Sequence, residues 1–289
     1  MLTLFHAASR SARCLRVLAL LAIASCDGDD DPASPNPPQI QGRPIYAVTL
    51  DNRLLLFGSG DAGTIVNEAP ITGLAAGQRI VSIDFRPADG LLYGVGTDSR
   101  VYAINVTTAA ATAVGATFAP ALDGTHFGLA INPVVDRIRI SSSETEQNLR
   151  IDPSDGTLSA VDVNFAFATG DDNEGTNPSV AALAYTNSTQ GATTTVAYGI
   201  DSNNDVLVTL ANPNSGLLTT IGLLGVNTVP CASLDIDAAD GIAYATLADG
   251  GISRLYTINL TTGGATLVGI IDVDSEVQGI AIALYLQEG

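Results

Sequence analysis

The chain has 289 residues, and its 30 acidic side chains outnumber its 12 basic ones, which gives a formal net charge of −18 at pH 7. A surface of this charge repels the phosphate backbone of nucleic acids and attracts cations, so no nucleic-acid partner is expected. All the basic residues are arginine, which excludes Schiff-base chemistry on a lysine.

The first 25 residues have the layout of a secretory signal. Three arginines precede an apolar run at residues 17–24, which is too short to span a bilayer. The run ends in A-S-C, which resembles the signal of bacterial lipoproteins, whose cysteine is lipidated and begins the mature chain. We therefore expect a signal peptide at 1–25, a lipid on Cys26 and a net charge that changes from −18 to −21 when the three arginines leave. An ordinary signal peptide with a chance cysteine is the alternative.

Residues 26–44 are rich in aspartate and proline and show no apolar periodicity, which predicts a solvated tether. From Ile45 onward the pattern of apolar and polar residues changes. Short apolar runs of about four to seven residues alternate with Gly, Asp, Asn and Pro turns, and no stretch has a helical period. The domain at 45–289 is therefore predicted to be all-β.

This domain repeats itself. SIDFRPADGLLYGV at 82–95 and SLDIDAADGIAYAT at 233–246 place two strands around the same A-D-G turn, and weaker copies begin at 128, 181 and 278. A third and a fourth strand follow in most copies. Four strands per unit of about 50 residues, repeated five times, predict a five-bladed β-propeller of four-stranded antiparallel blades.

The order of the pieces predicts how the ring closes. The C-terminal unit supplies only a first strand, VQGIAIAL at 277–284, whereas the N-terminus supplies a second, third and fourth. We expect one blade to be shared by the two ends, with 277–284 beside 45–50, so that only short sheet edges stay exposed. A β-sandwich with irregular duplication is the competing architecture.

The stretch GDDNEGTNP at 170–178 gathers oxygen-bearing side chains around a glycine and is expected to follow a strand at 158–167. An EF-hand calcium loop needs oxygen ligands at positions 1, 3 and 5 and glutamate at position 12, and no start in this stretch satisfies that pattern. Two interpretations remain. The side chains satisfy the backbone of a turn, or they bind a cation, with calcium as the natural choice. The candidate ligands are Asp171, Asp172, Asn173 and Glu174.

Asp84 and Asp235 occupy the same place on the first strand of their units, usually the innermost strand of a blade. Paired carboxylates near a propeller axis would suit the acid–base hydrolysis of a glycan or an ester. Because both precede an A-D-G turn, a repeated local hydrogen bond explains them more simply. Hydrolysis predicts that both face an open tunnel, and the structural interpretation predicts that each bonds its own turn.

Other residue types narrow the chemistry. His126 is the only histidine after the predicted signal, which excludes a multi-histidine zinc or copper site within one chain. A Ser-His-Asp relay would have to use His126 and has no G-x-S-x-G partner motif. Cys231 is the only thiol expected to stay free, and it is predicted to be a buried small hydrophobe. The absence of tryptophan weakens carbohydrate stacking, although eight tyrosines remain.

Two stretches carry a family resemblance: DRIRISSSETEQNLRIDPSDGTL at 136–158 and GDDNEGTNPSVAALAYTNS at 170–188. They resemble the bacterial family known as domain of unknown function 4394, and the likeness runs from about residue 45 to residue 284. The resemblance implies a secreted or surface-anchored repeat protein. It brings no established activity and no catalytic residues.

These features predict a monomeric, lipid-anchored propeller of the bacterial cell envelope that faces the periplasm or the cell surface. A binding or scaffold role is favoured over catalysis, with a protein or glycan of the envelope as the partner and membrane contact only through the lipid. No cofactor is expected, except calcium if the loop at 170–178 binds it. The alternative is a carboxylate-dependent hydrolase that uses Asp84 and Asp235.

Overall fold

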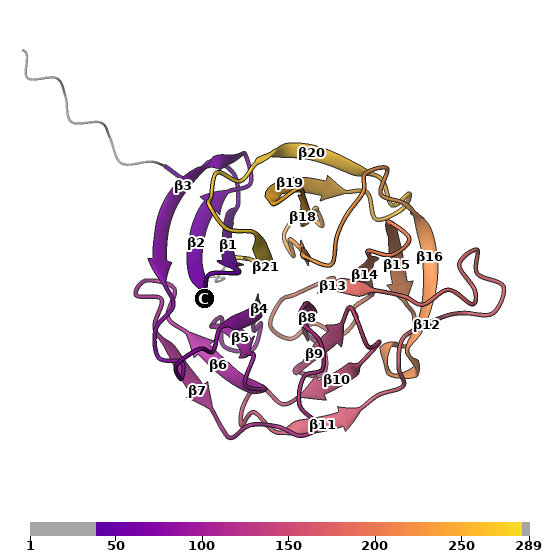
Figure 1. Cartoon of the computed structure of the whole chain (residues 1–289), viewed down its shortest axis with the longest axis horizontal. Coiled ribbons are helices and arrows are strands. Elements are labelled where there is room, and N and C mark those ends of the chain that lie inside the picture. Colours follow the sequence, from indigo (N-terminus) through magenta and orange to yellow (C-terminus); the bar gives the residue numbers. More distant parts are fainter. Residues whose placement is uncertain (1–38, 285–289) are drawn as a thin grey trace, which may run out of the picture. The chain divides into compact units, whose positions relative to one another are not determined.

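The computed structural model describes residues 39–284, which form five β-sheets around a central axis (Figure 1). Each sheet has four antiparallel strands, and one sheet gains a short fifth strand that runs parallel to its neighbour. The predicted five-bladed β-propeller is confirmed. We letter the blades A to E in ring order, starting from the blade that contains the first strand of the chain.

The strands are given from the innermost to the outermost of each blade. Blade A contains β21 (Val277–Ile282), β1 (Pro44–Thr49), β2 (Arg53–Gly58) and β3 (Asp61–Pro70). Blade B contains β4 (Ile80–Phe85), β5 (Leu92–Gly96), β6 (Arg100–Ile104) and β7 (Ala111–Val114). Blade C contains β8 (Phe127–Asn132), β9 (Arg137–Ser142), β10 (Asn148–Ile151) and β11 (Leu158–Val161).

Blade D contains β13 (Val180–Tyr185), β14 (Ala197–Asp201), β15 (Val206–Leu210) and β16 (Leu217–Leu223), with β12 (Ala166–Phe167) added outside β16. Blade E contains β17 (Ala232–Ile236), β18 (Ala243–Asp249), β19 (Ile252–Ile258) and β20 (Ala265–Ile270). A single 3-10 turn, η1 (Pro213–Ser215), precedes β16.

The two ends of the described chain meet in blade A, as the sequence predicts. Strand β21 pairs antiparallel with β1, and Ala47 lies opposite Ile280. The pairing continues at both ends of the ladder, because the Leu50 N–H donates to the Glu276 carbonyl at 2.9 Å and the Ala283 N–H donates to the Pro44 carbonyl at 3.0 Å. The closing pair therefore supplies the inner strand that blade A would otherwise lack.

The apolar core lies between the blades. The five innermost strands are almost completely buried, and neighbouring innermost strands pack against each other around the ring. Five clusters of buried apolar side chains each draw on two adjacent blades; one joins Ile83 of blade B to Val48 of blade A, and another joins Leu234 of blade E to Ile200 of blade D. Burial of these faces is what holds the separate sheets together.

The expected strand at residues 158–167 is wrong as a single element. Strand β11 ends at Val161, and the chain then leaves blade C and adds β12 to the outer edge of blade D. The break falls at Asp162, whose carboxylate accepts hydrogen bonds from Arg139 and Arg150. Phe165 and Phe167 are then buried in the core of blade D, which compensates for the lost continuation of β11.

Arg139 fastens blade C to blade D. Tyrosine occupies its place on the second strand of the other blades, at positions 46, 93, 198 and 244. The Arg139 side chain is 3% exposed and donates to the Tyr185 hydroxyl at 3.0 Å, the Asp162 carboxylate at 2.9 Å and the Asn214 amide oxygen at 2.6 Å. It also donates to the amide oxygen of Asn148. A buried guanidinium satisfied on every side is a fixed joint between two sheets.

Replacing Arg139 with methionine should destabilise the protein by about 3–5 kcal/mol, because it leaves buried acceptors and a carboxylate without their donor. Urea unfolding at neutral pH measures the loss. The matched control is Arg150→Met, which removes two hydrogen bonds to the same Asp162 from a side chain that is 28% exposed. Arg150→Met should cost only about 1 kcal/mol. Equal costs for the two variants would show that Arg139 is not the joint.

Candidate functional site

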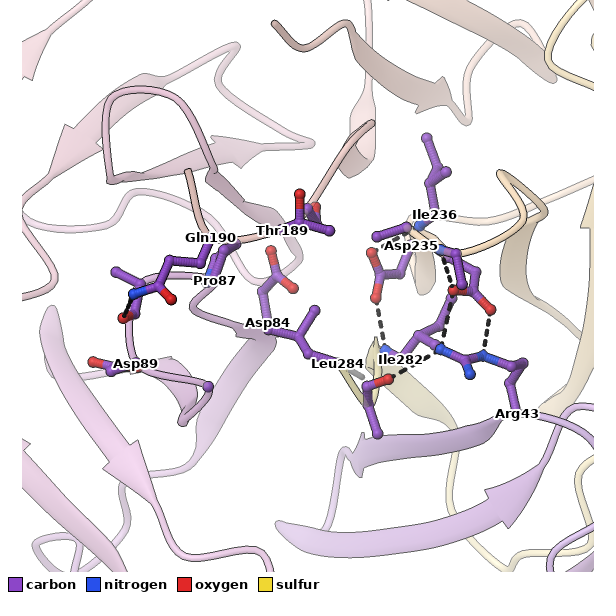
Figure 2. Close-up of a pocket in the computed structure, with 17 residues that line it drawn as sticks. Arg43, Asp84, Pro87, Asp89, Thr189, Gln190, Asp235, Ile236, Ile282 and Leu284 are labelled. Atoms are coloured by element: carbon purple, nitrogen blue, oxygen red, sulfur yellow. Dashed lines mark hydrogen bonds and ion pairs between the residues drawn. The ribbon is translucent and has the colours of Figure 1, made fainter. Parts of the chain in front are cut away.

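A cavity of about 1100 Å³ opens where the C-terminal ends of the innermost strands converge (Figure 2). We call it the central cavity. Its walls are the segments that follow β4, β13, β17 and β21, together with Arg43, which precedes β1. It is lined by Arg43, Asp84, Pro87, Ala88, Asp89, Gly90, Ser188, Thr189, Gln190, Asp235, Ile236, Asp237, Ala238, Ala239, Ile282, Ala283 and Leu284. The loop between β8 and β9 contributes nothing to this lining, so the walls come from blades A, B, D and E.

The structure brings Asp84 and Asp235 into this one cavity, on either side of it in Figure 2. Both residues are more than nine-tenths buried, at 8% and 7% exposed. Asp84 Oδ2 accepts the Ile131 N–H at 2.7 Å, and Asp235 Oδ2 accepts the Ile282 N–H at 2.6 Å. Each carboxylate thus bonds the innermost strand of the next blade.

The simpler expectation, a hydrogen bond to the blade's own A-D-G turn, therefore needs correction. Asp235 does accept a local bond, from the N–H of the next residue, Ile236, at 2.7 Å. The bond that repeats, however, spans 47 residues in both cases and joins one blade to the next. The other expectation, that both carboxylates face a common opening, agrees with the cavity. The two aspartates thus fasten blades and present charge at once.

Burial decides the protonation of the two carboxyls. The pKa of Asp84 is raised well above its ordinary value, mainly by burial and also by the negative charge of Asp235. Hydrogen bonds from the N–H groups of Ile131 and Phe85 lower this pKa but do not cancel the rise. Burial likewise raises the pKa of Asp235 to about 7, although the N–H groups of Ile282 and Ile236 favour its ionised form. The nearby Asp237 adds to this rise. Both carboxyls therefore retain a proton to a higher pH than an exposed aspartate does.

Asp84 and Asp235 take part in no ion pair between residues that the structure describes. Arg43 lies in the same cavity, but its guanidinium pairs with Asp237 and donates to the Ala283 carbonyl at 3.3 Å. The carboxylate oxygens of Asp84 and Asp235 therefore line the cavity without an ion-pair partner among residues 39–284.

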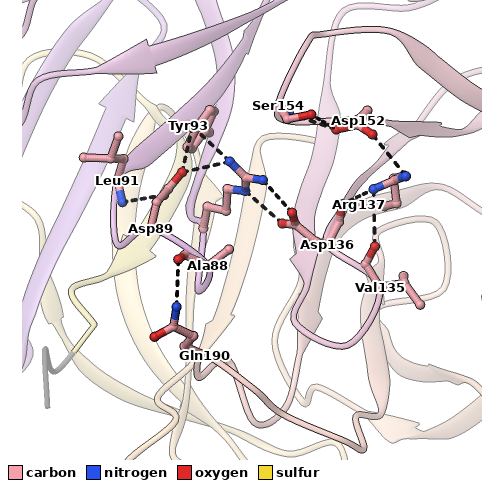
Figure 3. A network of polar contacts seen from close by, with 11 residues as sticks. Ala88, Asp89, Leu91, Tyr93, Val135, Asp136, Arg137, Asp152, Ser154 and Gln190 are labelled. Atoms are coloured by element: carbon pink, nitrogen blue, oxygen red, sulfur yellow. Dashed lines mark hydrogen bonds and ion pairs between the residues drawn. The ribbon is translucent and has the colours of Figure 1, made fainter.

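The rim on the side of blade B is braced by a polar network (Figure 3). Arg86 donates to Asp136 of the next blade at 2.8 Å and to Asp89 at 2.8 Å, and the Tyr93 hydroxyl donates to Asp89 at 3.0 Å. The hydrogen bonds from Arg86 to Asp136 raise the pKa of the arginine further. Asp136 has φ +50°, a left-handed conformation that glycine adopts at the matching turn position Gly90, with φ +72°. The ion pair compensates for this strain and fixes the loop that carries Asp89.

The oxygen-rich loop at 170–178 contributes no residue to this cavity, and its side chains bond its own backbone and Thr220 of β16. Asp171 accepts the Thr220 N–H at 2.6 Å and the Asn173 N–H at 3.0 Å, and Glu174 accepts the Gly170 N–H at 2.8 Å. Burial opposes the ionisation of Asp171, but these hydrogen bonds outweigh it and lower its pKa. Asp172 is exposed.

No group of three or more His, Cys, Asp or Glu side chains within residues 39–284 is arranged to hold a metal ion. The turn interpretation of the loop at 170–178 therefore has direct support in its hydrogen bonds. Calcium binding by the same four residues stays a prediction.

Two other residues singled out in the sequence lie outside the cavity lining. Cys231 is buried, as predicted. Burial raises the pKa of its thiol to about 12, so the nucleophilic thiolate is disfavoured at neutral pH. His126 precedes β8 and therefore lies at the opposite end of an innermost strand, where its Nδ1 contacts the Glu144 carboxylate at 3.2 Å. Cys26 falls outside the residues that the structure describes. Within the described part of the chain, no helix is long and apolar enough to cross a bilayer.

Three cavity residues escaped the sequence analysis. Arg43 lies in the stretch assigned to the tether, yet its N–H donates to the Ser59 hydroxyl at 2.9 Å and the strand β1 begins at the next residue. Asp237 lies between the repeated residue Asp235 and the repeated A-D-G turn, and the other copy of this unit has Arg86 at the matching position, so the repeat gave no signal for it. Gln190 sits in a polar loop whose sequence gives no indication of its contacts.

This architecture defines the protein as a five-bladed β-propeller with an acidic central cavity. The family model described as "Domain of unknown function (DUF4394)" matches residues 53–281, about four fifths of the chain, and the chain belongs to that family. No curated protein matches it.

Solved structures show likeness at the level of the fold. A structural genomics protein of unknown function from Bacteroides thetaiotaomicron VPI-5482 aligns with a TM-score of 0.50 and 14% identity, over 86% of this chain and 65% of that one. A chain from a nidogen/laminin complex has a TM-score of 0.49 and 11% identity, over 84% and 98% of the two chains. A protein of unknown function from Bacteroides caccae has a TM-score of 0.40 and 12% identity, over 81% and 74%.

The raised pKa values predict a pH dependence of stability. An unfolded aspartate loses its proton near pH 4, whereas the folded pair retains protons to a higher pH. The contribution of this pair to the free energy of unfolding should therefore be greatest below about pH 4 and be lost as the pH rises through about 7, by up to about 1.4 kcal/mol per pH unit for each retained proton. Urea unfolding at several pH values from 4 to 8 measures this slope.

The control separates this effect from the general repulsion of an acidic chain. Asp84→Asn and Asp172→Asn each remove one carboxylate, but only Asp84 is buried in the central cavity. Asp84→Asn should flatten the slope, and Asp172→Asn should leave it as in the wild type. If both variants change the slope equally, the buried pair is not its source.

Proposed function

We propose that the protein is a ligand-binding β-propeller of the bacterial cell envelope, and that its central cavity binds a segment of an envelope glycan that bears amino and hydroxyl groups. The observation that carries the proposal is the pair Asp84 and Asp235, buried in one cavity without a cationic partner among the described residues. The propeller fold is consistent with a binding or scaffold module. The glycan, the envelope and the anchor are our inference.

The chemistry of the walls supports a ligand rich in donors. An ionised carboxylate accepts hydrogen bonds and donates none. A buried carboxylate is therefore stabilised most by a ligand that brings both a hydrogen-bond donor and a positive charge. Thr189 and Gln190 add a hydroxyl and an amide to the same cavity. A volume of about 1100 Å³ suits an oligosaccharide segment better than a folded protein domain.

Two short oligosaccharides that differ in the acetylation of their amino groups, and therefore in charge, test the site. A glucosamine trimer carries free amino groups, and an N-acetylglucosamine trimer does not. We expect the first to bind the full-length protein more tightly in calorimetric titration, by about tenfold, because a desolvated charge-assisted hydrogen bond is worth more than a neutral one. Asp235→Asn should remove this preference.

A second pair of variants controls for location. Ala238→Phe places a ring at the cavity wall and should abolish binding, whereas Ala113→Phe, on the outer strand of blade B, should not. Failure of both trimers to bind, or loss of binding in both phenylalanine variants, contradicts the proposed site.

A hydrolase is the second candidate, and one observation favours it. Two carboxyls with raised pKa values line a single cavity, as the carboxyl pair of a glycosidase would. The hydrogen bonds of Asp84 and Asp235 to the next blades also give both residues a structural role. For this reason we favour ligand binding over hydrolysis. Mass spectra taken during the same titrations distinguish the two, because a hydrolase would shorten the trimer.

The anchor at Cys26 is proposed from the basic and apolar signal that precedes it. Cys26→Ser should abolish the incorporation of labelled fatty acid and release the protein from the membrane fraction. Cys14→Ser, within the predicted signal itself, is the matched control and should leave labelling intact. Labelling that persists in Cys26→Ser would remove the lipid anchor from the proposal and leave the cavity unaffected.

A further inference from the structure

The loop between the first two strands of blade D differs from its counterparts. It has 11 residues, 186–196, whereas the corresponding loops have six residues in blades B and E and four in blade C. Its residues Ser188, Thr189 and Gln190 line the central cavity. We call the segment 186–196 the strap.

The strap crosses the mouth of the cavity. The Gln190 amide donates to the Ala88 carbonyl at 3.1 Å, and Ala88 belongs to the loop that follows β4 in blade B. Blades D and B are not neighbours, because blade C stands between them on one side of the ring and blades E and A on the other. This span explains why the loop of blade C is missing from the lining: the strap forms the wall on that side. Figure 2 shows Gln190 beside Pro87 at the mouth.

The base of the strap is rigid. The Thr186 N–H donates to the Val196 carbonyl at 3.0 Å and the Val196 N–H donates to the Thr186 hydroxyl at 2.9 Å, which extends the hairpin beyond β13 and β14. The Asn187 amide donates to the Thr194 carbonyl at 3.0 Å. These bonds fix the direction in which the strap leaves blade D.

The tip of the strap is held far less firmly. Among the described residues, its tip is tied to blade B by the one hydrogen bond from Gln190, which is exposed. A second hollow of about 300 Å³ lies beside the tip, lined by strap residues and by Ala238 of blade E. Asn187 and Gly191 have positive φ angles of +56° and +79° on either side of Gln190. The tip thus has a single tether, room beside it and a rigid base to pivot on.

We propose that the strap is a gate over the central cavity and that the Gln190–Ala88 hydrogen bond is its latch, which limits the size of the molecules that enter. The inference rests on the proposed function only in treating the central cavity as the binding site. It adds that a ligand as large as an oligosaccharide enters after the strap has left blade B.

A thiol placed in the cavity tests the gate without any ligand. Ala283→Cys puts the reporter on the wall formed by blade A, and peptide mass spectrometry of the full-length protein follows alkylation at that position alone. The probes are iodoacetamide, which is small, and fluorescein maleimide, which is bulky. Gln190→Glu keeps the shape of the side chain but removes the donor. It should speed the reaction with the bulky probe about fivefold, the effect of one exposed hydrogen bond, and change the reaction with the small probe less.

The matched control is Thr193→Ala, on the same strap, which is exposed and makes no hydrogen bond among residues 39–284. It should leave both rates unchanged, and a second variant, Gln190→Ala, should behave like Gln190→Glu. Equal rates for the bulky probe in all these backgrounds would overturn the gate. Because alkylation needs no glycan, that result would leave the proposed binding function standing, and failure of glycan binding would leave the gate standing.

Discussion

The antiparallel pairing of β21 with β1 is the interaction on which the rest of the molecule depends. It brings residues from the two ends of the described chain into one sheet, and it completes the apolar cluster between blades E and A. The entropic cost of closing so long a loop falls on this one contact. The burial of almost the whole of β21 offsets that cost. The cavity depends on the same pairing, because Ile282 ends β21, Ala283 follows it and Arg43 precedes β1.

The two cavity aspartates show how a joint between blades becomes a site. The innermost strands leave N–H groups on the edge that faces the axis, and Asp84 and Asp235 each satisfy one of them on the next blade. Blades B and E, which carry these aspartates, flank blade A, where alanine occupies the equivalent position 281. The carboxylates therefore stand on two sides of the closing blade, and both side chains are buried at the cavity wall. Desolvation there raises both pKa values and makes a proton or a cationic group a favourable occupant.

Particular residues mark where reasoning from the sequence stopped. Residues 158–167 continue a strand-like pattern, yet Asp162 turns towards Arg139 and Arg150, and Phe167 is buried in the next blade. The alternation of residues along one segment cannot show that part of it will pair with a strand of another blade, as β12 does with β16. Arg43 lies in a proline-rich stretch with the composition of a tether, although its side chain pairs with Asp237, 194 residues further along. Gln190 reaches a carbonyl 102 residues away, which no spacing in the loop could indicate.

The sequence by itself determined the class of fold, the number of blades and the order in which the ring closes. These follow from the local alternation of apolar and polar residues and from a repeat of about 50 residues, both of which can be seen in the order of residue types along the chain. Only the tertiary structure decided that Asp84 and Asp235 bond neighbouring blades, that they share a cavity and that a strap from blade D spans it. The reason is physical: each of these features joins side chains or backbone groups of different blades, and their positions are set by how the sheets pack around the axis rather than by the residues next to them.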